Sequence, residues 1–286
     1  MRVFITGAGG QLGYDLQAAF SGSHHEVIAA DHAACDVTDR DAVMAAITST
    51  RPDAVIHAAA WTAVDACESD PDRAFRVNAL GSRFVAEAAA RIGAAVHYVS
   101  TDYVFDGSKR TPYTEWDEPS PRSVYGWSKL AGEREVQAIA PAATIIRTSW
   151  VSGRHGNNMV KTILRLAAEH EMLRFVADQR GHPTFTADLA VAIRRLVVER
   201  RVGVFHLTNQ GAVSWYGFAR AVLEAAGLDP DRVQPISTSE LDPPRPAPRP
   251  ANSVLANQAW EASGLPLLRD FREPLAELIH ELGATH

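Results

Sequence analysis

The chain has 286 residues, including two cysteines, and this length suffices for one large domain, or one domain with a small lobe, around a substantial core. The formal net charge is −6, and the chain lacks the positive charge typical of nucleic-acid-binding proteins, so nucleic acid is not expected as a partner. The flanks of Cys35 and Cys67 show no spacing typical of metal ligands. No apolar run approaches the ~20 residues of a membrane span, and the first strand starts at residue 2 without room for a signal peptide, so we expect a cytoplasmic protein without membrane contact.

The N-terminal segment reads as a buried strand over 2–6 that runs into a glycine-rich turn and then a helix over about 10–20. Gly7 permits a tight turn, Gly10 lets the backbone approach a pyrophosphate, and Gly13 allows the helix to pack closely on the strand. The free N–H groups at the start of the helix then face the anion. We therefore predict a phosphate-binding turn, although the spacing G-x-x-G-x-x-G differs from the common dehydrogenase pattern.

Short β-branched runs then alternate with amphipathic helices along the first half of the chain. The expected strands are 26–30, 53–57, 94–100 and 143–148, and the expected helices are 38–49, 70–92 and 123–139. This alternation predicts an α/β fold with a Rossmann-type, doubly wound parallel sheet. Such sheets bind ligands at the carboxyl ends of their strands, where the sequence places Asp31, residues 58–60, Thr101 and Trp150.

The helix expected over 123–139 carries Tyr125 and Lys129, which are four residues apart and so share one face. A Tyr hydroxyl can protonate a carbonyl oxygen, but its ordinary pKa near ~10 is high for acid–base work at neutral pH. A neighbouring ammonium group is expected to lower that pKa. The pair predicts a general acid, although Tyr and Lys at this spacing also occur on ordinary helix surfaces.

Beyond residue 150 the sequence pattern predicts shorter helices and strands, and residues 242–250 form a proline-rich stretch. Because a helical pattern resumes after this stretch, we interpret it as a loop rather than a linker. The predicted organisation is an NAD(P)-binding domain over 1–150 and a mainly substrate-binding, smaller C-terminal lobe over 151–286, from which some segments return to the first domain.

Together these motifs resemble the extended short-chain dehydrogenase/reductases and, within them, the dTDP-4-dehydrorhamnose reductase family. The resemblance spans almost the whole chain. The segments that carry it are 7–13, 58–65, 100–107, 124–133, 147–151 and 178–184, of which the last two are typical of the sugar-nucleotide branch.

The resemblance implies that a reduced nicotinamide delivers hydride to C4 of dTDP-4-dehydro-L-rhamnose and forms dTDP-L-rhamnose. It makes Tyr125 the general acid, and Thr101 the group that orients the carbonyl. Lys129 would bind the nicotinamide ribose and lower the pKa of Tyr125. The alternative for Thr101 is a turn cap, and Ser100 beside it could share its role.

The same resemblance supplies the remaining binding residues. For the cofactor they are Gly7, Gly9, Gly10, Gln11, Leu12, Gly13, Asp31, Asp36, Val37, Ala58, Ala59, Ala60, Tyr125 and Lys129. For the dTDP-sugar they are Val64, Asp102, Tyr103, Trp150, Asn158 and Arg249, the last toward the diphosphate. Trp150 could equally be plain core, and Arg249 a surface residue. Asp31 favours NADH, yet NADPH stays open, and Mg²⁺ is compatible although no carboxylate cluster identifies a site.

Two positions depart from the family pattern. Ser152 stands where an aromatic often follows Trp-Val, which leaves the identity of the sugar open. His57 stands where Asn is common, and we interpret it as a packed residue at a strand end rather than a second acid.

Two alternatives stay open at this stage. One is a 4-ketoreductase for another nucleotide-linked deoxysugar, which would share the same catalytic residues. The other is a non-catalytic regulatory subunit of a methionine adenosyltransferase, which keeps the fold and much of the cofactor site. The sequence is compatible with a homodimer and does not define the oligomeric state.

Overall fold

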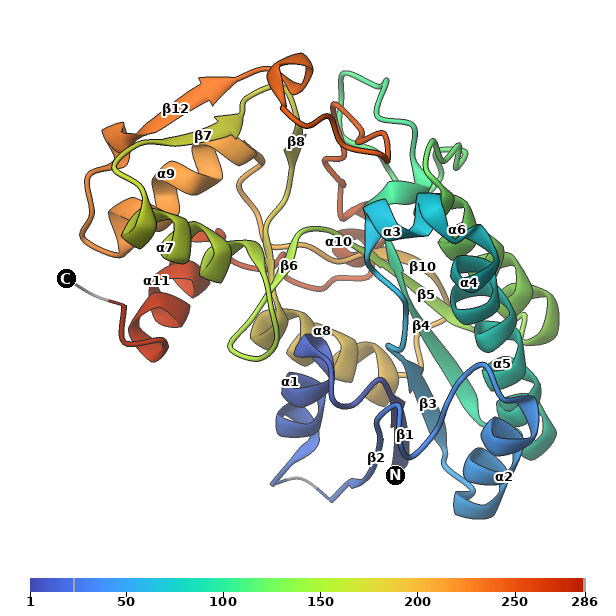
Figure 1. Ribbon diagram of the computed structural model, residues 1–286. Helices are drawn as coiled ribbons and strands as arrows, with labels where there is room; N and C mark the ends of the chain where they lie inside the picture. The colour runs from blue at the N-terminus through green and yellow to red at the C-terminus, as the bar shows by residue number, and fades with distance from the viewer. Residues whose placement is uncertain (23, 285–286) are drawn as a thin grey trace.

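The computed structural model describes residues 1–22 and 24–284, which form a six-stranded parallel sheet and a group of smaller elements (Figure 1). The strand order is β10-β5-β4-β3-β1-β2. Three strands begin one residue later than expected, and the predicted parallel sheet is confirmed. The strands are β1 (Arg2–Thr6), β2 (Glu26–Ala30), β3 (Ala54–His57), β4 (Ala95–Thr101), β5 (Thr144–Thr148) and β10 (Gly203–His206).

Helices cover both faces of this sheet, as a doubly wound fold requires. One face carries α1 (Gln11–Phe20) and α8 (Thr186–Val198). The opposite face carries α2 (Arg40–Thr50), α5 (Gly81–Ile92) and α6 (Val124–Ile139) (Figure 1). β2 lies on one side of β1 and β3 on the other, so the order of strand addition reverses between β1 and β3. Parallel sheets bind ligands beside such a switch point.

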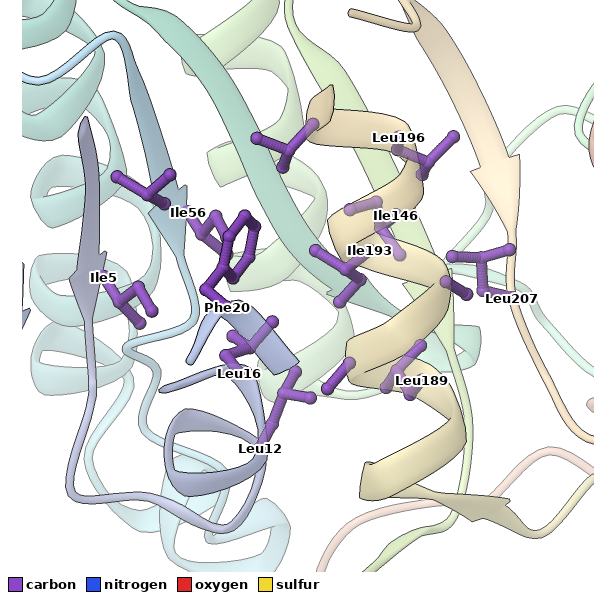
Figure 2. Packing of buried hydrophobic residues seen from close by; sticks show 14 of the residues in the cluster. Ile5, Leu12, Leu16, Phe20, Ile56, Ile146, Leu189, Ile193, Leu196 and Leu207 are labelled. Carbon is purple, nitrogen blue, oxygen red and sulfur yellow. The ribbon is translucent and has the colours of Figure 1, made fainter. Parts of the chain in front are cut away.

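The core under α8 shows how a late segment completes the sheet (Figure 2). Leu189, Ile193 and Leu196 of α8 belong to one buried cluster with Leu16 and Phe20 of α1. Side chains of the central strands complete this cluster: Ile5, Ile56 and Ile146. Since α8 and β10 lie far beyond residue 150 and yet pack on this sheet, the core depends on both halves of the sequence.

The single helix expected over 70–92 is wrong in detail. The segment forms α4 (Pro71–Phe75), a π-helical turn η1 (Arg76–Leu80) and then α5. Within that turn Asn78 is fully buried, and its amide bonds the backbone of Trp61 in both directions and the hydroxyl of Ser128. These partners come from distant segments, so the periodicity of the helix gave no sign of the turn.

A second hydrophobic core lies beside the sheet, at the upper left of Figure 1. It is built by α7 (Met159–Glu169), α9 (Trp215–Ala225), α11 (Arg272–Glu281) and the pair β7 (Leu173–Val176) and β12 (Val233–Ile236). The boundary at residue 150 stays a prediction. The short elements are α3 (Val64–Ser69), η2 (Asp102–Val104), β6 (Val151–Ser152), β8 (Arg180–Gly181), β9 (Thr184–Phe185), β11 (Val213–Ser214), η3 (Pro230–Arg232), η4 (Thr238–Glu240) and α10 (Gln258–Ala262).

Within residues 1–22 and 24–284, none of the helices combines the length and the apolar character that crossing a membrane would need.

Candidate active site

The glycine-rich turn between β1 and α1 is closely packed against the end of β3. Gly7 has a φ of 68°, and a Cβ there would lie 2.7 Å from the backbone nitrogen of Ala59. A Cβ on Gly13 would lie 2.3 Å from the carbonyl oxygen of Gly7. α1 begins after Gly10 with neither a side-chain cap nor an acidic residue in its first turn. Its first N–H groups are therefore available to an anion.

Two cavities meet at this turn. The first, of about 630 Å³, extends from Gly7 and Gly10 past Asp31 and Val37 to Ala59. The second, of about 400 Å³, extends from Gly10 and Gln11 over the ends of β4 and β5. Both share Gly7, Gly10, Ala58 and Ala60, so the two cavities adjoin along the carboxyl ends of the strands, and together they are called the cleft.

The acidic residues expected at the first cavity differ in their contacts. Asp31 is exposed, and its Oδ1 accepts a hydrogen bond from the N–H of Ala34 at 2.9 Å. The carboxylate of Asp36 accepts from both the N–H and the hydroxyl of Thr38, and these hydrogen bonds lower its pKa. The cavity is lined by Asp31 and Val37 and not by Asp36.

The three predicted catalytic residues line the second cavity together. Thr101, at the end of β4, donates from its hydroxyl to Asp102 Oδ1 at 3.0 Å and accepts from the N–H of Tyr103, so it also acts as the expected cap. Tyr125 lies in the first turn of α6, and its ring meets that of Tyr103 edge on. Lys129 follows one turn later with its Nζ donating to the carbonyl of Val99 at 2.8 Å.

The electrostatics of Tyr125 differ from expectation. We predicted that Lys129 would lower its pKa, but burial raises the pKa of Tyr125 well above its ordinary value. The Thr101 hydroxyl opposes this rise, and the Asp102 carboxylate adds to it. Lys129 contributes no resolved effect because its own burial lowers its pKa to about 7, and the Glu133 carboxylate only partly offsets this. Tyr125 accordingly holds its proton at neutral pH.

Ser100, the residue that could share the role of Thr101, also lines the second cavity. Successive side chains of a strand point to opposite faces, and Ser100 lies on the face of α6, where its hydroxyl donates to Glu133 Oε1 at 2.5 Å. The hydroxyl is thus committed to a buried carboxylate.

The residues expected to bind the sugar fall into two groups. Val64, Asp102, Tyr103 and Trp150 line the second cavity. Burial raises the pKa of Asp102 to about 6, and its Oδ2 has no hydrogen-bond partner among the described residues. The Oδ2 atom is itself buried, and the nearby Ser253 hydroxyl opposes the rise in pKa, so Asp102 is a buried carboxyl at the edge of the cavity lining.

Asn158 and Arg249 lie outside the lining of that cavity and are engaged elsewhere. Asn158 caps α7, and its amide donates to Gln11 Oε1 at 3.0 Å and to the carbonyl of Gly153. Arg249 pairs with Asp65 of α3, and its Nη2 lies 2.7 Å from Asp65 Oδ2. The pair fastens the proline-rich stretch onto α3, so this stretch is a packed loop as expected.

Sequence reasoning missed Trp215, which begins α9 and lines the second cavity. Its ring stacks on that of Trp150 with centroids 3.5 Å apart and planes 7° apart. Trp150 has a φ of 47°, an uncommon value for a residue other than glycine. The only local signal was Ser214, a helix cap before Trp215, and nothing near it indicated a partner 65 residues earlier in the chain.

The two positions that depart from the family pattern are both buried. His57 bonds Thr6 through Nδ1 at 2.7 Å and Ser82 through Nε2 at 3.0 Å. Burial lowers its pKa to about 3, so it stays neutral, and its interpretation as a packed residue is confirmed. Ser152 lies in β6, where its carbonyl accepts from the hydroxyl of Thr186.

A further cavity of about 550 Å³ lies at the opposite, amino-terminal edge of the sheet, with Arg51, Asp53, His97 and Arg201 among its lining residues. None of the predicted site residues is part of its lining. Over the described ranges, no three His, Cys, Asp or Glu side chains gather into a cluster that could hold a metal ion.

Comparisons with known proteins extend over the whole of this architecture. Residues 1–284 match the family model of the RmlD substrate binding domain. The chain is 43% identical to the dTDP-4-dehydrorhamnose reductase of Mycolicibacterium smegmatis, over 99% of this chain and 87% of that protein. It is also 43% identical to the probable dTDP-4,6-dihydroxy-2-methyloxan-3-one 4-ketoreductase of Streptomyces antibioticus, over 100% of this chain and 97% of that protein.

Among solved structures, a dTDP-4-dehydrorhamnose reductase from Bacillus anthracis in complex with NADP is similar with a TM-score of 0.94. The two chains are 38% identical, and the similarity covers 98% of this chain and 99% of that one.

Proposed function

The chain belongs to the RmlD substrate binding domain family, and from this premise we propose that it reduces the C4 ketone of dTDP-4-dehydro-L-rhamnose to give dTDP-L-rhamnose. The reductant is NADPH or NADH. The observation that carries the proposal is that Thr101, Tyr125 and Lys129 line one cavity together with the glycine-rich turn.

The residues of the first cavity suit a dinucleotide. The close packing at Gly7 and Gly13 brings the backbone near the space where a pyrophosphate would lie, and the uncapped start of α1 offers N–H donors. Residues 9–13, 58–60 and Val37 would hold the cofactor, with Asp31 toward the adenosine ribose and Asp36 assigned by its place in the motif. When bound, the nicotinamide supplies the hydride.

The chain's own groups would handle the proton. Tyr125 holds its proton at neutral pH and is the group that would donate it to the carbonyl oxygen. Because burial raises its pKa, the phenolate that forms must be stabilised when substrate and cofactor are bound. Thr101 would orient the carbonyl, and Lys129 would bind the nicotinamide ribose. Since the pKa of Lys129 is about 7, its charge changes within the working range, and activity is expected to depend on pH there.

The substrate side of the cleft would bind the sugar through Val64, Asp102, Tyr103 and Trp150. Asn158 would support it through Gln11, which lines the cavity. We assign the diphosphate to Arg249, which must then exchange part of its pairing with Asp65 for the phosphate oxygens. On this proposal residues 1–150 supply the cofactor domain, residues 151–286 mainly supply the substrate lobe, and α8 and β10 return to the sheet.

A second candidate is reduction of another nucleotide-linked 4-keto deoxysugar. The Streptomyces antibioticus relative, which bears a different 4-ketoreductase name, is as similar in sequence as the dTDP-4-dehydrorhamnose reductase from Mycolicibacterium smegmatis. Ser152, at the position where the family often has an aromatic, is the departure that would accompany a different sugar.

The test is oxidation of NADPH and of NADH, followed by absorbance, with dTDP-4-keto-L-rhamnose generated in situ. We expect turnover by the wild type and a loss of about 100-fold or more in Tyr125→Phe. Tyr14→Phe is the matched control, because Tyr14 is 46% exposed and stacks on His155. Absence of turnover with either cofactor, despite cofactor binding, would contradict the proposal and direct the search to other keto-sugars.

A further inference from the structure

A third residue continues the line of Tyr125 and Lys129 along α6. Glu133 lies one further turn along, so the three side chains share the face of the helix that packs on β4. Glu133 is only 2% exposed. A carboxylate this deeply buried is costly unless it is paired and hydrogen-bonded.

Glu133 is held by two neighbouring strands at once. Arg147 of β5 donates from Nη2 to Oε2 at 2.7 Å and from Nε to Oε1 at 3.0 Å. Ser100 of β4 donates to the same Oε1 at 2.5 Å. Ser100 and Arg147 are direct neighbours in the sheet register. One carboxylate therefore fixes α6 to the strand pair whose carboxyl ends carry Thr101 and Trp150.

The same carboxylate is the counter-charge that acts on Lys129. Lys129 is 2% exposed and has a neutral hydrogen-bond partner, the carbonyl of Val99, with its ammonium 4.1 Å from the centre of the Tyr98 ring. Burial lowers the Lys129 pKa, and the Glu133 carboxylate raises it. Arg147 limits this effect because its cation pairs with Glu133 directly.

We propose that Glu133 is a positioning residue: with Arg147 and Ser100 it fixes the register of α6 on the sheet and sets the charge of Lys129. The inference rests on the proposed reduction for its consequence in catalysis. Its physical content, the coupling between the Glu133–Arg147 pair and Lys129, is independent of turnover.

The coupling between Glu133 and Lys129 can be measured because most other titratable groups near Lys129 and Tyr125 keep their charge near neutral pH. His57 has a pKa of about 3 and Cys67 of about 11, and burial raises the pKa values of Tyr98 and Tyr125. None of these four changes charge near neutral pH. Asp102 does, with a pKa of about 6. On α5, Arg83 pairs with Glu87 and Glu135 at the surface.

The sequence offers a direct probe, because its only lysines are Lys109, Lys129 and Lys161. Labelling lysine with ¹³C at the ε carbon gives three signals, which Lys109→Arg and Lys161→Arg assign. In Glu133→Gln the Arg147 cation is left without its counter-charge, so the Lys129 midpoint should fall by about one pH unit. In Arg147→Met the Glu133 anion is left uncompensated, so the midpoint should rise by a similar amount.

Shifts of the Lys129 midpoint in opposite directions in the two variants support the proposal. Shifts in the same direction, or no shift, overturn it, because a purely structural role predicts no dependence on the sign of the removed charge. Glu135→Gln, on the exposed side of α6, is the control and should leave the midpoint in place. Asp102→Asn identifies any contribution from that carboxyl.

If Glu133→Gln or Arg147→Met fails to fold, Ser100→Ala tests the coupling instead. It removes one donor to Glu133, so the Lys129 midpoint should rise, and an unchanged midpoint overturns the proposal. In turnover the pH profile of kcat should move in the same direction as the NMR midpoint for each variant. A wild type without turnover would refute the proposed function alone, because the lysine titration still tests the coupling.

Discussion

The two halves of the cleft differ in the groups that line them, which are mainly backbone in one half and side chains in the other. The proposed cofactor half is formed by backbone: Gly7 and Gly13 lie against neighbouring main-chain atoms, and α1 presents its uncapped N–H groups. The proposed substrate half is lined by side chains that hold one another across distant segments, as Trp150 does with Trp215. The Arg249–Asp65 pair, outside that lining, is likewise a contact between distant segments. A backbone site depends on residue spacing within one turn, whereas a side-chain site depends on pairs that the fold brings together.

The largest effect should come from adding a side chain to the backbone half. In Gly13→Ala the Cβ would lie 2.3 Å from the Gly7 carbonyl and 2.6 Å from Ala8 Cα, so the turn must move. We expect the KM for the cofactor to rise about 100-fold and the Tm to fall by about 5 °C. Steady-state kinetics and thermal unfolding measure the two effects.

Gly9→Ala is the matched control for stability in the same turn. Its Cβ would contact only the Asp31 side chain at 3.4 Å, so the Tm should stay near that of the wild type. Equal losses of stability in both variants would show that the turn tolerates no side chain anywhere, and would contradict the specific packing role of Gly13.

The substrate half should respond to Trp215→Ala with little change on the cofactor side. Removing Trp215 frees one face of Trp150, whose φ of 47° depends on its surroundings. We expect the KM for the sugar nucleotide to rise about tenfold, in keeping with the value of a stacked aromatic pair, while the cofactor KM stays constant. Trp116→Ala is the control because Trp116 is 71% exposed. A parallel rise in both KM values would break the distinction between the halves.

The sequence predicted the backbone half well because its signals are local. Strand and helix periods located the sheet, and the glycines 7, 10 and 13 lie within a single turn. The π turn at 76–80 escaped prediction because the partners of Asn78 are Trp61 and Ser128.

The substrate half shows where spacing gives no information. Trp150 was recognised from a motif, but its partner Trp215 lies on another helix and was missed. Tyr125 and Lys129 were placed correctly in one cavity, whereas the expected effect of Lys129 on the Tyr125 pKa was wrong because burial of both groups dominates. Spacing locates a group on an element, and tertiary burial then decides its pKa.

Asp31 is the exception in the backbone half, since it would act through its side chain. Its Oδ1 already accepts from Ala34, which leaves Oδ2 for a ribose hydroxyl. We expect Asp31→Ala to raise the KM for NADH several-fold more than that for NADPH, because each lost hydrogen bond to a charged group is worth about 1.5–3 kcal/mol. Kinetics with both cofactors measure this ratio. Equal effects on both would remove Asp31 from the ribose site.

The smallest expected effect concerns the Asp65–Arg249 pair in the substrate half. The hydrogen bond from Arg249 lowers the pKa of Asp65 from 3.8 to about 2, against the opposing effect of burial. Because the folded-state pKa lies below the unfolded value, the pair stabilises the fold above pH 3.8, and this contribution is lost as the pH falls toward 2. Asp65→Asn should therefore reduce the free energy of unfolding by about 1 kcal/mol at pH 7.

The difference in the free energy of unfolding between wild type and Asp65→Asn should become smaller between pH 4 and pH 2. Urea unfolding at pH 7, 4 and 3 measures this difference. Asp231→Asn is the control, since Asp231 pairs with Arg220 but is 79% exposed, and its gap should be near zero throughout. A gap that does not change with pH would show that the Asp65 carboxylate is not what fastens the proline-rich stretch. In that case, Arg249 would be held by the loop backbone and would need no release from Asp65 to meet a diphosphate.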